Sequence, residues 1–252
     1  MDNPRKNTVT FRFYEELNDH LKYSLQKKEI PYTFGIGQTV KDAVEKLGIP
    51  HCEIDLIVVN GESVNFEYRL SEGDYISVYP VFETLDISPV VRLRPEPLRI
   101  IRFILDAHLG KLARMLRLLG FDSLYRNDFE DDEVVRLASK ERRIILTRDR
   151  GLLMHRKVTH GYFLRNINPD RQLTEVVNRF RLRSLLKPFA RCALCNGEIE
   201  NVAKESVLTQ LPRNTARYYD EFYICNSCGQ VYWKGSHYAK LMKRIQGLGD
   251  LG

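Results

Sequence analysis

The sequence predicts an α/β protein with more than one domain, and three observations support this. Strand-like alternation and helix-like spacing of apolar residues follow one another along most of the 252 residues. The sign of the charge changes along the chain: residues 1–85 carry 9 basic and 14 acidic side chains, and residues 86–252 carry 30 and 19. Two pairs of cysteines in the last quarter of the chain indicate a small domain held by a metal ion.

Composition excludes several classes of protein. The 43% of hydrophobic and 29% of charged residues are typical of a globular chain and exclude a disordered or collagen-like one. No apolar run approaches the ~20 residues needed to span a bilayer, and the first residues lack a signal-peptide core. We therefore expect a cytoplasmic protein without a membrane partner. In that compartment, five cysteines favour a metal site over a disulfide framework.

A proline-rich segment divides the chain. Residues 86–98 contain three prolines, which disfavour helix interiors and central strands, and the charge changes sign there. The net charge of +11 beyond it suggests a polyanionic partner, most often a nucleic acid, or simply a solvated basic surface. The predicted division is into residues 1–85, a linker at 86–98, residues 99–184 and residues 185–252.

The first part is expected to combine strands with one helix. Thr39 can cap a helix that Gly48 ends, and Asn60-Gly61 is typical of a tight turn after a strand. The expected elements are, in order, a strand at 9–14, its hairpin partner at 32–36, a helix at 40–47, and strands at 56–60 and 75–79.

This part resembles a ubiquitin-like β-grasp domain. The segments VVNG at 58–61 and LSEGD at 70–74, followed by a final strand, are similar to the small sulfur carriers of thiamine and molybdopterin synthesis. Those carriers end in a free Gly-Gly, which is activated for sulfur transfer. Here the chain continues through residues 81–85 without Gly-Gly, so we do not expect that chemistry. The alternatives are a docking or regulatory domain for a protein partner, or an inert folding partner.

The second part is expected to form a parallel sheet with helices on both faces. An apolar strand at 100–105 precedes a helix at 110–119, and a helix at 131–139 precedes a strand at 143–147. Three basic residues spaced three apart lie on a second face of the first helix. They are Lys111, Arg114 and Arg117.

Three aspartates mark the candidate site. Asp106 and Asp149 follow the two strands, and ligands of such sheets bind at the carboxyl ends of strands. Asp131 lies at the expected start of the second helix and can reach them. Close carboxylates repel unless a cation joins them, and Mg²⁺ or Mn²⁺ prefers such oxygen ligands. That arrangement fits phosphodiester hydrolysis.

Several residues of this site also have a simpler explanation, whereas packing explains a carboxylate at Asp106, after an apolar strand, poorly. Asp131 could only cap its helix, and Asp149 could only be a turn residue. His108 and Lys111 could contact phosphate or could be ordinary surface residues, and Arg148 could also steady a phosphate.

At these positions the sequence resembles the Mut-seven C-terminal RNase domain, which belongs to the PIN-like nucleases. The resemblance rests on LDAHLGKLARMLRLLGFD at 105–122, DDE at 131–133 and ILTRD at 145–149. It implies a metal-dependent ribonuclease in which Asp106, Asp131 and Asp149 match the acidic positions. Asp132 is an alternative match to the second position.

The resemblance also shows a departure. Many PIN domains place a fourth acid two residues after the third aspartate, and that position is Gly151 here. Asp128 is the nearest candidate to replace it. The departure leaves the number of metal ions and the strength of catalysis open.

The cysteine pairs predict a structural zinc site. Cys192, Cys195, Cys225 and Cys228 form two CxxC pairs separated by 29 residues, a spacing typical of a zinc ribbon. Redox chemistry is the alternative. Four thiolates leave no open coordination position, so we do not expect this zinc to be catalytic. Cys52 is expected to be a buried free thiol.

The ribbon alternates cations with aromatic residues, which can stack on unpaired bases while the cations contact phosphates. Trp233 and Lys234 are candidates for such contacts, and Tyr223 and Tyr232 are expected in the ribbon's small core. The preferred function is a ribonuclease with a structural Zn²⁺ and a catalytic Mg²⁺ or Mn²⁺, acting on single-stranded or structured RNA. The alternative is a non-catalytic RNA-binding adaptor that keeps the fold.

Overall fold

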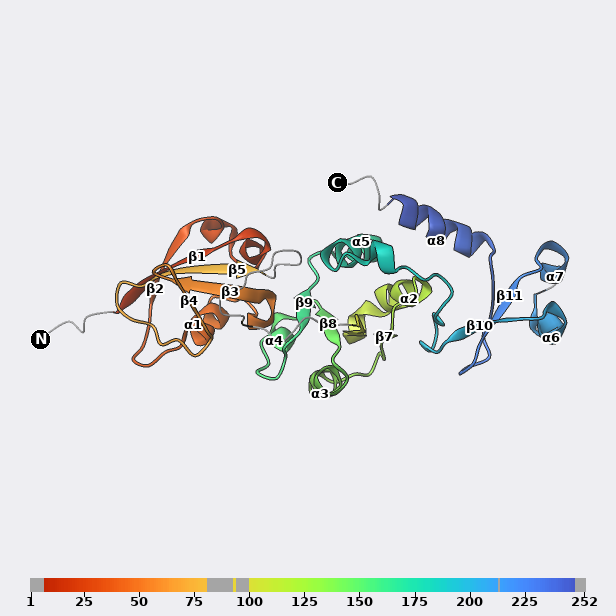
Figure 1. Ribbon diagram of the computed structural model, residues 1–252, viewed down its shortest axis with the longest axis horizontal. Helices are drawn as coiled ribbons and strands as arrows, with labels where there is room; N and C mark the ends of the chain where they lie inside the picture. Colours follow the sequence, from red (N-terminus) through yellow and green to blue (C-terminus); the bar gives the residue numbers. More distant parts are fainter. Residues whose placement is uncertain (1–6, 81–92, 94–99, 213, 248–252) are drawn as a thin grey trace, which may run out of the picture. The chain divides into compact units, whose positions relative to one another are not determined.

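The computed structural model (Figure 1) describes residues 7–80, 93, 100–212 and 214–247. The chain divides into two compact units. The first unit comprises residues 1–100 and 130–163, and the second comprises residues 101–129 and 164–252. The predicted continuation of the last β-grasp strand through 81–85 lies outside the described residues, as does the linker at 86–98 apart from residue 93.

A five-stranded mixed sheet forms the N-terminal part of the first unit. Its strand order is β2-β1-β5-β3-β4; β1 runs parallel to β5, and the other neighbours are antiparallel. This confirms the predicted β-grasp domain, although β2 begins three residues before the predicted hairpin partner. The strands are β1 (Thr8–Phe13), β2 (Glu29–Thr33), β3 (Ile54–Val59), β4 (Glu62–Val64) and β5 (Tyr75–Pro80).

Local signals explain the helix and the turn of this domain. Helix α1 (Val40–Lys46) begins at a capping box, in which Thr39 accepts from the backbone of Asp42 and the Asp42 side chain accepts from Thr39. Asn60 and Gly61 both have positive φ, as the tight turn between β3 and β4 requires. The helix packs its apolar face on the sheet through Val40, Ala43 and Val44.

Two parallel strands complete the first unit, together with two helices. Strands β8 (Ile144–Thr147) and β9 (Gly161–Phe163) pair in parallel, with Thr147 opposite Phe163. Helix α3 (Asp131–Glu141) packs on β8, and helix α4 (Arg150–Leu153) packs on both strands. The β-grasp part of this unit also contains three short 3-10 turns, η1 (Glu15–His20), η2 (Tyr23–Leu25) and η3 (His51–Glu53).

The second unit contains another parallel pair, β6 (Phe103–Leu105) and β7 (Ser123–Leu124). The two parallel pairs confirm the prediction of a parallel sheet in the second part of the chain. Strand β6 is half the length predicted. The unit's helical elements here are η4 (Ala107–Leu109), α2 (Gly110–Leu118), α5 (Pro169–Arg179) and η5 (Leu182–Leu185).

A three-stranded antiparallel ribbon follows, in the order β10-β11-β12. Its small core consists of Val207, Phe222 and Val231. Within the described residues, no helix is both long and apolar enough to cross a bilayer. The elements are β10 (Ile199–Val202), α6 (Lys204–Val207), η6 (Leu208–Gln210), α7 (Thr215–Tyr218), β11 (Phe222–Cys225), β12 (Val231–Trp233) and α8 (Ser236–Gly247).

Candidate functional site

Asp106 directly follows the fully buried strand β6, and its own side chain is half-buried. The chain then turns through η4 into α2. Tyr125 fixes this turn, because its hydroxyl donates to the carbonyl of Ala107 at 2.9 Å. The same ring lies against Gly110, where an added Cβ would lie 2.6 Å from the hydroxyl, so a larger residue at the start of α2 would displace Tyr125. His108 and Lys111 are exposed on this turn.

Asp149 follows the buried strand β8 and is held by two local hydrogen bonds. Its backbone N–H donates to Thr147 Oγ1 at 2.8 Å, and Thr147 is fully buried. Its Oδ1 accepts the N–H of Gly151 at 2.7 Å, which makes Asp149 the N-cap of α4. Asp149 and the preceding Arg148 are exposed. The carboxylate is therefore fixed in direction at a strand end, and the cap occupies one of its lone pairs.

The glycine in place of the fourth acid lies inside this cap. A Cβ at position 151 would lie 3.1 Å from Asp149 Oδ1, closer than an ordinary van der Waals contact. The proposed substitute, Asp128, accepts from Arg126 Nε at 2.9 Å and from Nη2 at 3.1 Å. These hydrogen bonds hold the pKa of Asp128 below its usual value. The carboxylate of Asp128 is thus paired with the Arg126 guanidinium.

Asp131 is the first residue of α3, and the N-cap position belongs to Glu130. The interpretation of Asp131 as the helix cap is therefore wrong. Asp131 and Asp132 are both exposed in the first turn, where negative charge is favourable next to the helix dipole. Asp131 and Asp149 lie in the first compact unit and Asp106 lies in the second. Their meeting around an ion stays a prediction.

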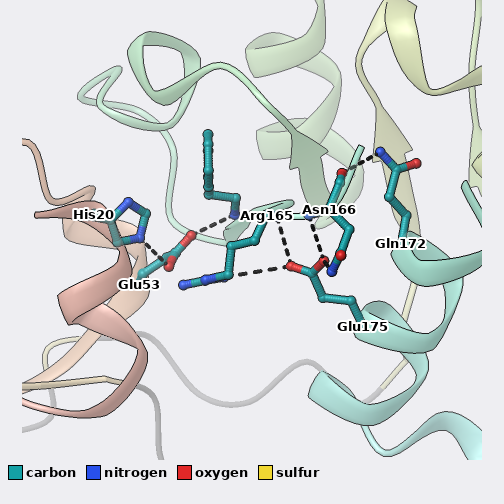
Figure 2. Close-up of polar contacts among 7 residues, drawn as sticks. His20, Glu53, Arg165, Asn166, Gln172 and Glu175 are labelled. Atoms are coloured by element: carbon teal, nitrogen blue, oxygen red, sulfur yellow. Dashed lines mark hydrogen bonds and ion pairs between the residues drawn. The ribbon is translucent and has the colours of Figure 1, made fainter. Parts of the chain in front are cut away.

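A half-buried carboxylate that the sequence did not single out is Glu175 of α5 (Figure 2). It accepts the backbone N–H of Arg165 at 2.9 Å, and the N–H and side-chain amide of Asn166 at 3.2 and 2.7 Å. Gln172 also donates to the carbonyl of Asn166 at 2.9 Å. Glu175 therefore fixes Arg165 and Asn166, which follow β9, because its carboxylate accepts hydrogen bonds from their amide groups.

The four predicted cysteine ligands come together. Their sulfur atoms all lie within 4.8 Å of one another, with Cys195 and Cys225 3.4 Å apart and Cys192 and Cys228 3.6 Å apart. Zn–S bonds of about 2.3 Å in a tetrahedron place sulfur atoms roughly 3.8 Å apart. The cluster therefore fits a zinc ion, and all four thiols are free of disulfides.

Tyr232 supports the first cysteine. Its hydroxyl oxygen accepts the N–H of Ala193 at 3.0 Å and lies 3.1 Å from Cys192 Sγ, to which the hydroxyl can donate. Burial opposes ionisation of Cys192, but the hydrogen bonds from Tyr232 and the neighbouring backbone lower the pKa of the thiol to about 6. A thiolate at neutral pH is the form that binds metal. Burial and the adjacent sulfur raise the pKa of Tyr232, so it stays a donor.

Arg117 joins the first cysteine loop, residues 192–197, to helix α2. Its guanidinium donates to the carbonyls of Ala193 at 3.2 Å and Leu194 at 2.8 Å, and to that of Ser123 at 2.8 Å. The side chain is only 3% exposed. Burial lowers the pKa of Arg117, and the neighbouring sulfurs of Cys192 and Cys195 oppose that effect. The expected basic face of α2 is therefore wrong at this residue.

Asn196 makes a second connection. Its side chain accepts the N–H of Ser123 at 3.0 Å and donates to Asp122 Oδ1 at 2.8 Å. The positive φ of Asn196 is the conformation that such a loop needs. Arg117 and Asn196 fasten the cysteine loop to α2 and β7. No local sequence pattern indicates these contacts, because both Asn196 contacts span more than 70 residues.

The candidate RNA contacts of the ribbon have partners within the ribbon. Trp233 is half-buried and packs against the ribbon core. Lys234 forms an ion pair with Glu221, and its Nζ lies 6.0 Å from the centre of the Tyr223 ring. Phe189 stacks on Tyr223 at 5.4 Å. Lys234 is exposed and can exchange its partner for a phosphate, whereas Trp233 offers only part of its ring.

Comparison with known families gives two matches. The family described as the Mut7-C RNAse domain matches residues 101–245, and the family described as Mut7-C ubiquitin matches residues 6–86. Neither the curated proteins nor the solved structures gave a match.

Proposed function

Because the chain belongs to the Mut7-C RNase domain family, we propose that it is a ribonuclease that uses Mg²⁺ or Mn²⁺ at Asp106, Asp131 and Asp149. The family match carries the nuclease assignment, since it covers 145 residues of the chain, 101 to 245. Asp106 is the first residue after buried strand β6 and Asp149 the second after buried strand β8, and these positions support the choice of these carboxylates.

The donor set fits a hard divalent cation. Three carboxylates would hold the ion, and capping by Asp149 leaves further lone pairs for ligation. When bound, the ion supplies a Lewis acid and lowers the pKa of a coordinated water. The aspartates orient the reacting groups, and a water attacks the phosphorus in line with the leaving oxygen.

Basic residues around these aspartates would bind the substrate. His108, Lys111 and Arg148 are exposed next to Asp106 and Asp149 and would contact phosphates. The ribbon would hold the RNA further along the strand through Lys234 and the exposed part of Trp233. The zinc ion would be structural, and the protein would act on cytoplasmic RNA.

The Asp106→Asn variant tests this function directly. Labelled single-stranded RNA is incubated with Mn²⁺ and either the wild type or the variant, and cleavage is followed on a gel. Loss of a metal ligand should slow cleavage by at least about 100-fold, since even outer-shell changes cost up to that much. Asp170→Asn, an exposed aspartate on α5, is the matched control and should cleave normally.

Two results would change the assignment. Cleavage that survives Asp106→Asn would place the catalytic residues elsewhere. A wild type that binds varied RNAs without cutting any of them would instead indicate the non-catalytic adaptor.

A further inference from the structure

The ubiquitin-like domain and the segment that carries Asp149 belong to the same compact unit, and a buried polar seam joins them. We define the seam as the side chains of His20 at the end of η1 and of His51, Cys52 and Glu53 in η3, all of which are buried. Burying polar groups costs free energy unless they find hydrogen-bonding partners. The partners found here include backbone groups of α4, of β9 and of the chain between them.

Glu53 is the centre of the seam (Figure 2). Its Oε2 lies 2.8 Å from His20 Nε2, and its Oε1 accepts the N–H of Phe163, the last residue of β9, at 2.6 Å. The carboxylate is 2% exposed. The rings of His20 and Phe163 also touch, with centres 5.5 Å apart. One buried carboxylate of the ubiquitin-like domain therefore fixes the end of β9.

The other seam residues cover the chain between α4 and β9. His51 Nε2 donates to the carbonyl of Val158 at 2.8 Å, and Cys52 Sγ donates to the carbonyl of Leu153 at 3.6 Å. Gly161 lies so close that an added Cβ would be 3.2 Å from Cys52 Sγ. The prediction of Cys52 as a buried free thiol is confirmed, and the structure adds its packing partner.

The seam reaches Asp149 by two routes. Phe163 pairs with Thr147, whose hydroxyl accepts the backbone N–H of Asp149. On the other side of Asp149, Arg150 donates to the carbonyl of His20 at 3.0 Å, and its guanidinium lies 5.0 Å from the centre of the Phe163 ring. Thr147, before Asp149, is thus connected to the ubiquitin-like domain through Phe163, and Arg150, after Asp149, is hydrogen-bonded to it directly.

We propose that Glu53, supported by His20, is a positioning residue for Asp149. In this proposal the ubiquitin-like domain acts within its own chain, by holding the end of β9 and the start of α4 in the arrangement that metal binding needs. The proposal rests on the nuclease function proposed above. It gives the domain a role that neither a separate docking module nor an inert folding partner would have.

Two variants of the 252-residue chain test this. Glu53→Ala removes the acceptor for the Phe163 N–H, whereas Glu53→Gln keeps an oxygen that can accept it. Glu67→Ala, an exposed carboxylate of the same domain, is the control. Hydrogen exchange of the amides at 147–151 and the Mn²⁺ concentration for half-maximal cleavage are measured well below each thermal midpoint.

For Glu53→Ala we expect exchange at 147–151 to be roughly tenfold faster. The half-saturating Mn²⁺ concentration should rise about tenfold, which is typical when the support of a metal ligand is lost. Glu53→Gln should recover most of both effects, and Glu67→Ala should match the wild type.

Unchanged exchange and Mn²⁺ dependence in Glu53→Ala would overturn the proposal. A lower thermal midpoint with unchanged Mn²⁺ dependence would also overturn it, since that result shows a purely structural role. A wild type that neither responds to Mn²⁺ nor cleaves RNA would defeat the nuclease function, and the exchange data would still decide the coupling. If Glu53→Ala does not fold, Arg150→Met, a change at a partly exposed residue, carries the same test with the same expected direction.

Discussion

Arg117 shows how a single residue can escape a pattern-based prediction. Its spacing from Lys111 and Arg114 predicts a solvated basic face, and Lys111 and Arg114 are indeed exposed. Arg117 instead lies in the last turn of α2, where the cysteine loop approaches, and its guanidinium donates to carbonyls of that loop. Those carbonyls are more than 70 residues away in the sequence, so no local pattern could indicate them.

Replacing Arg117 should weaken both folding and zinc retention. Arg117→Met keeps much of the side chain's volume but removes the charged hydrogen bonds from the guanidinium to the carbonyls of Ala193 and Leu194, which should cost about 1–3 kcal/mol. Denaturant unfolding measures this loss, and a chromophoric chelator measures the faster release of zinc. Arg114→Met on the same helix should change stability by less than about 0.5 kcal/mol. Equal behaviour of the two variants would show that Arg117 does not hold the loop.

The cysteine cluster predicts a definite metal content. Metal analysis of the purified protein should give about one zinc per chain, since four thiolates make one closed site. Cys192→Ser or Cys225→Ser should lose that zinc, and the ribbon should unfold with it. Cys52→Ser is the matched control, because it removes a buried thiol outside the cluster and should keep the zinc. A folded wild type without zinc would contradict the assignment.

Among the helices and strands, the sequence predicted those whose ends are marked by a capping residue or by a turn sequence such as Asn-Gly. The capping box fixed the start of α1, and the Asn-Gly turn fixed the junction of β3 and β4. Strand β9 was not predicted, because its three residues are too few to show alternation. The 3-10 turns η1 and η3 were also missed, although they supply the whole seam. Their residues are held by contacts with distant parts of the chain, which no local propensity encodes.

Gly120 tests the packing between α2 and the chain that leads to the ribbon. It has a φ of +96°, and an added Cβ would lie 2.3 Å from the carbonyl oxygen of Lys187. Gly120→Ala should therefore cost about 3 kcal/mol, from backbone strain and from the clash together. Gly73 also has a positive φ but faces open space, so Gly73→Ala should cost only about 1 kcal/mol. Denaturant unfolding of both variants measures this difference. Equal losses of unfolding free energy would mean that the close approach of Gly120 to the Lys187 carbonyl does not contribute to stability.

For the whole molecule, the sequence predicted the domain types and the cysteine cluster better than the geometry of the three candidate aspartates. Each CxxC pair lies within one short loop, so the spacing itself brings two ligands together. Asp106, Asp131 and Asp149 are separated by 25 and 18 positions, and they belong to different compact units. Their distances depend on how these parts pack. The sequence therefore identifies the three candidate aspartates, but the distances between their carboxylates are determined by the tertiary structure.

The uneven charge predicts a salt-sensitive interaction with RNA. Residues 86–252 carry 30 basic and 19 acidic side chains, whereas residues 1–85 are net acidic. With about four phosphate contacts to a single strand, binding should weaken roughly fiftyfold between about 50 and about 200 mM salt. Fluorescence anisotropy of a labelled RNA, in EDTA to prevent cleavage, measures the slope. Affinity that does not change with salt would argue against phosphate contacts on this part of the chain.

The contact between Arg117 and the cysteine loop also limits how far the protein can be shortened. A fragment that stops at residue 184 would retain the guanidinium in its site between α2 and β7 but would lose the carbonyls of Ala193 and Leu194. It would also lose the Asn196 side chain that pairs with Ser123. In such a fragment the Arg117 guanidinium and the N–H of Ser123 in β7 would lose the hydrogen-bonding partners that the cysteine loop provides. Attempts to produce a minimal nuclease should therefore keep the ribbon, or replace Arg117 and the surface around it at the same time.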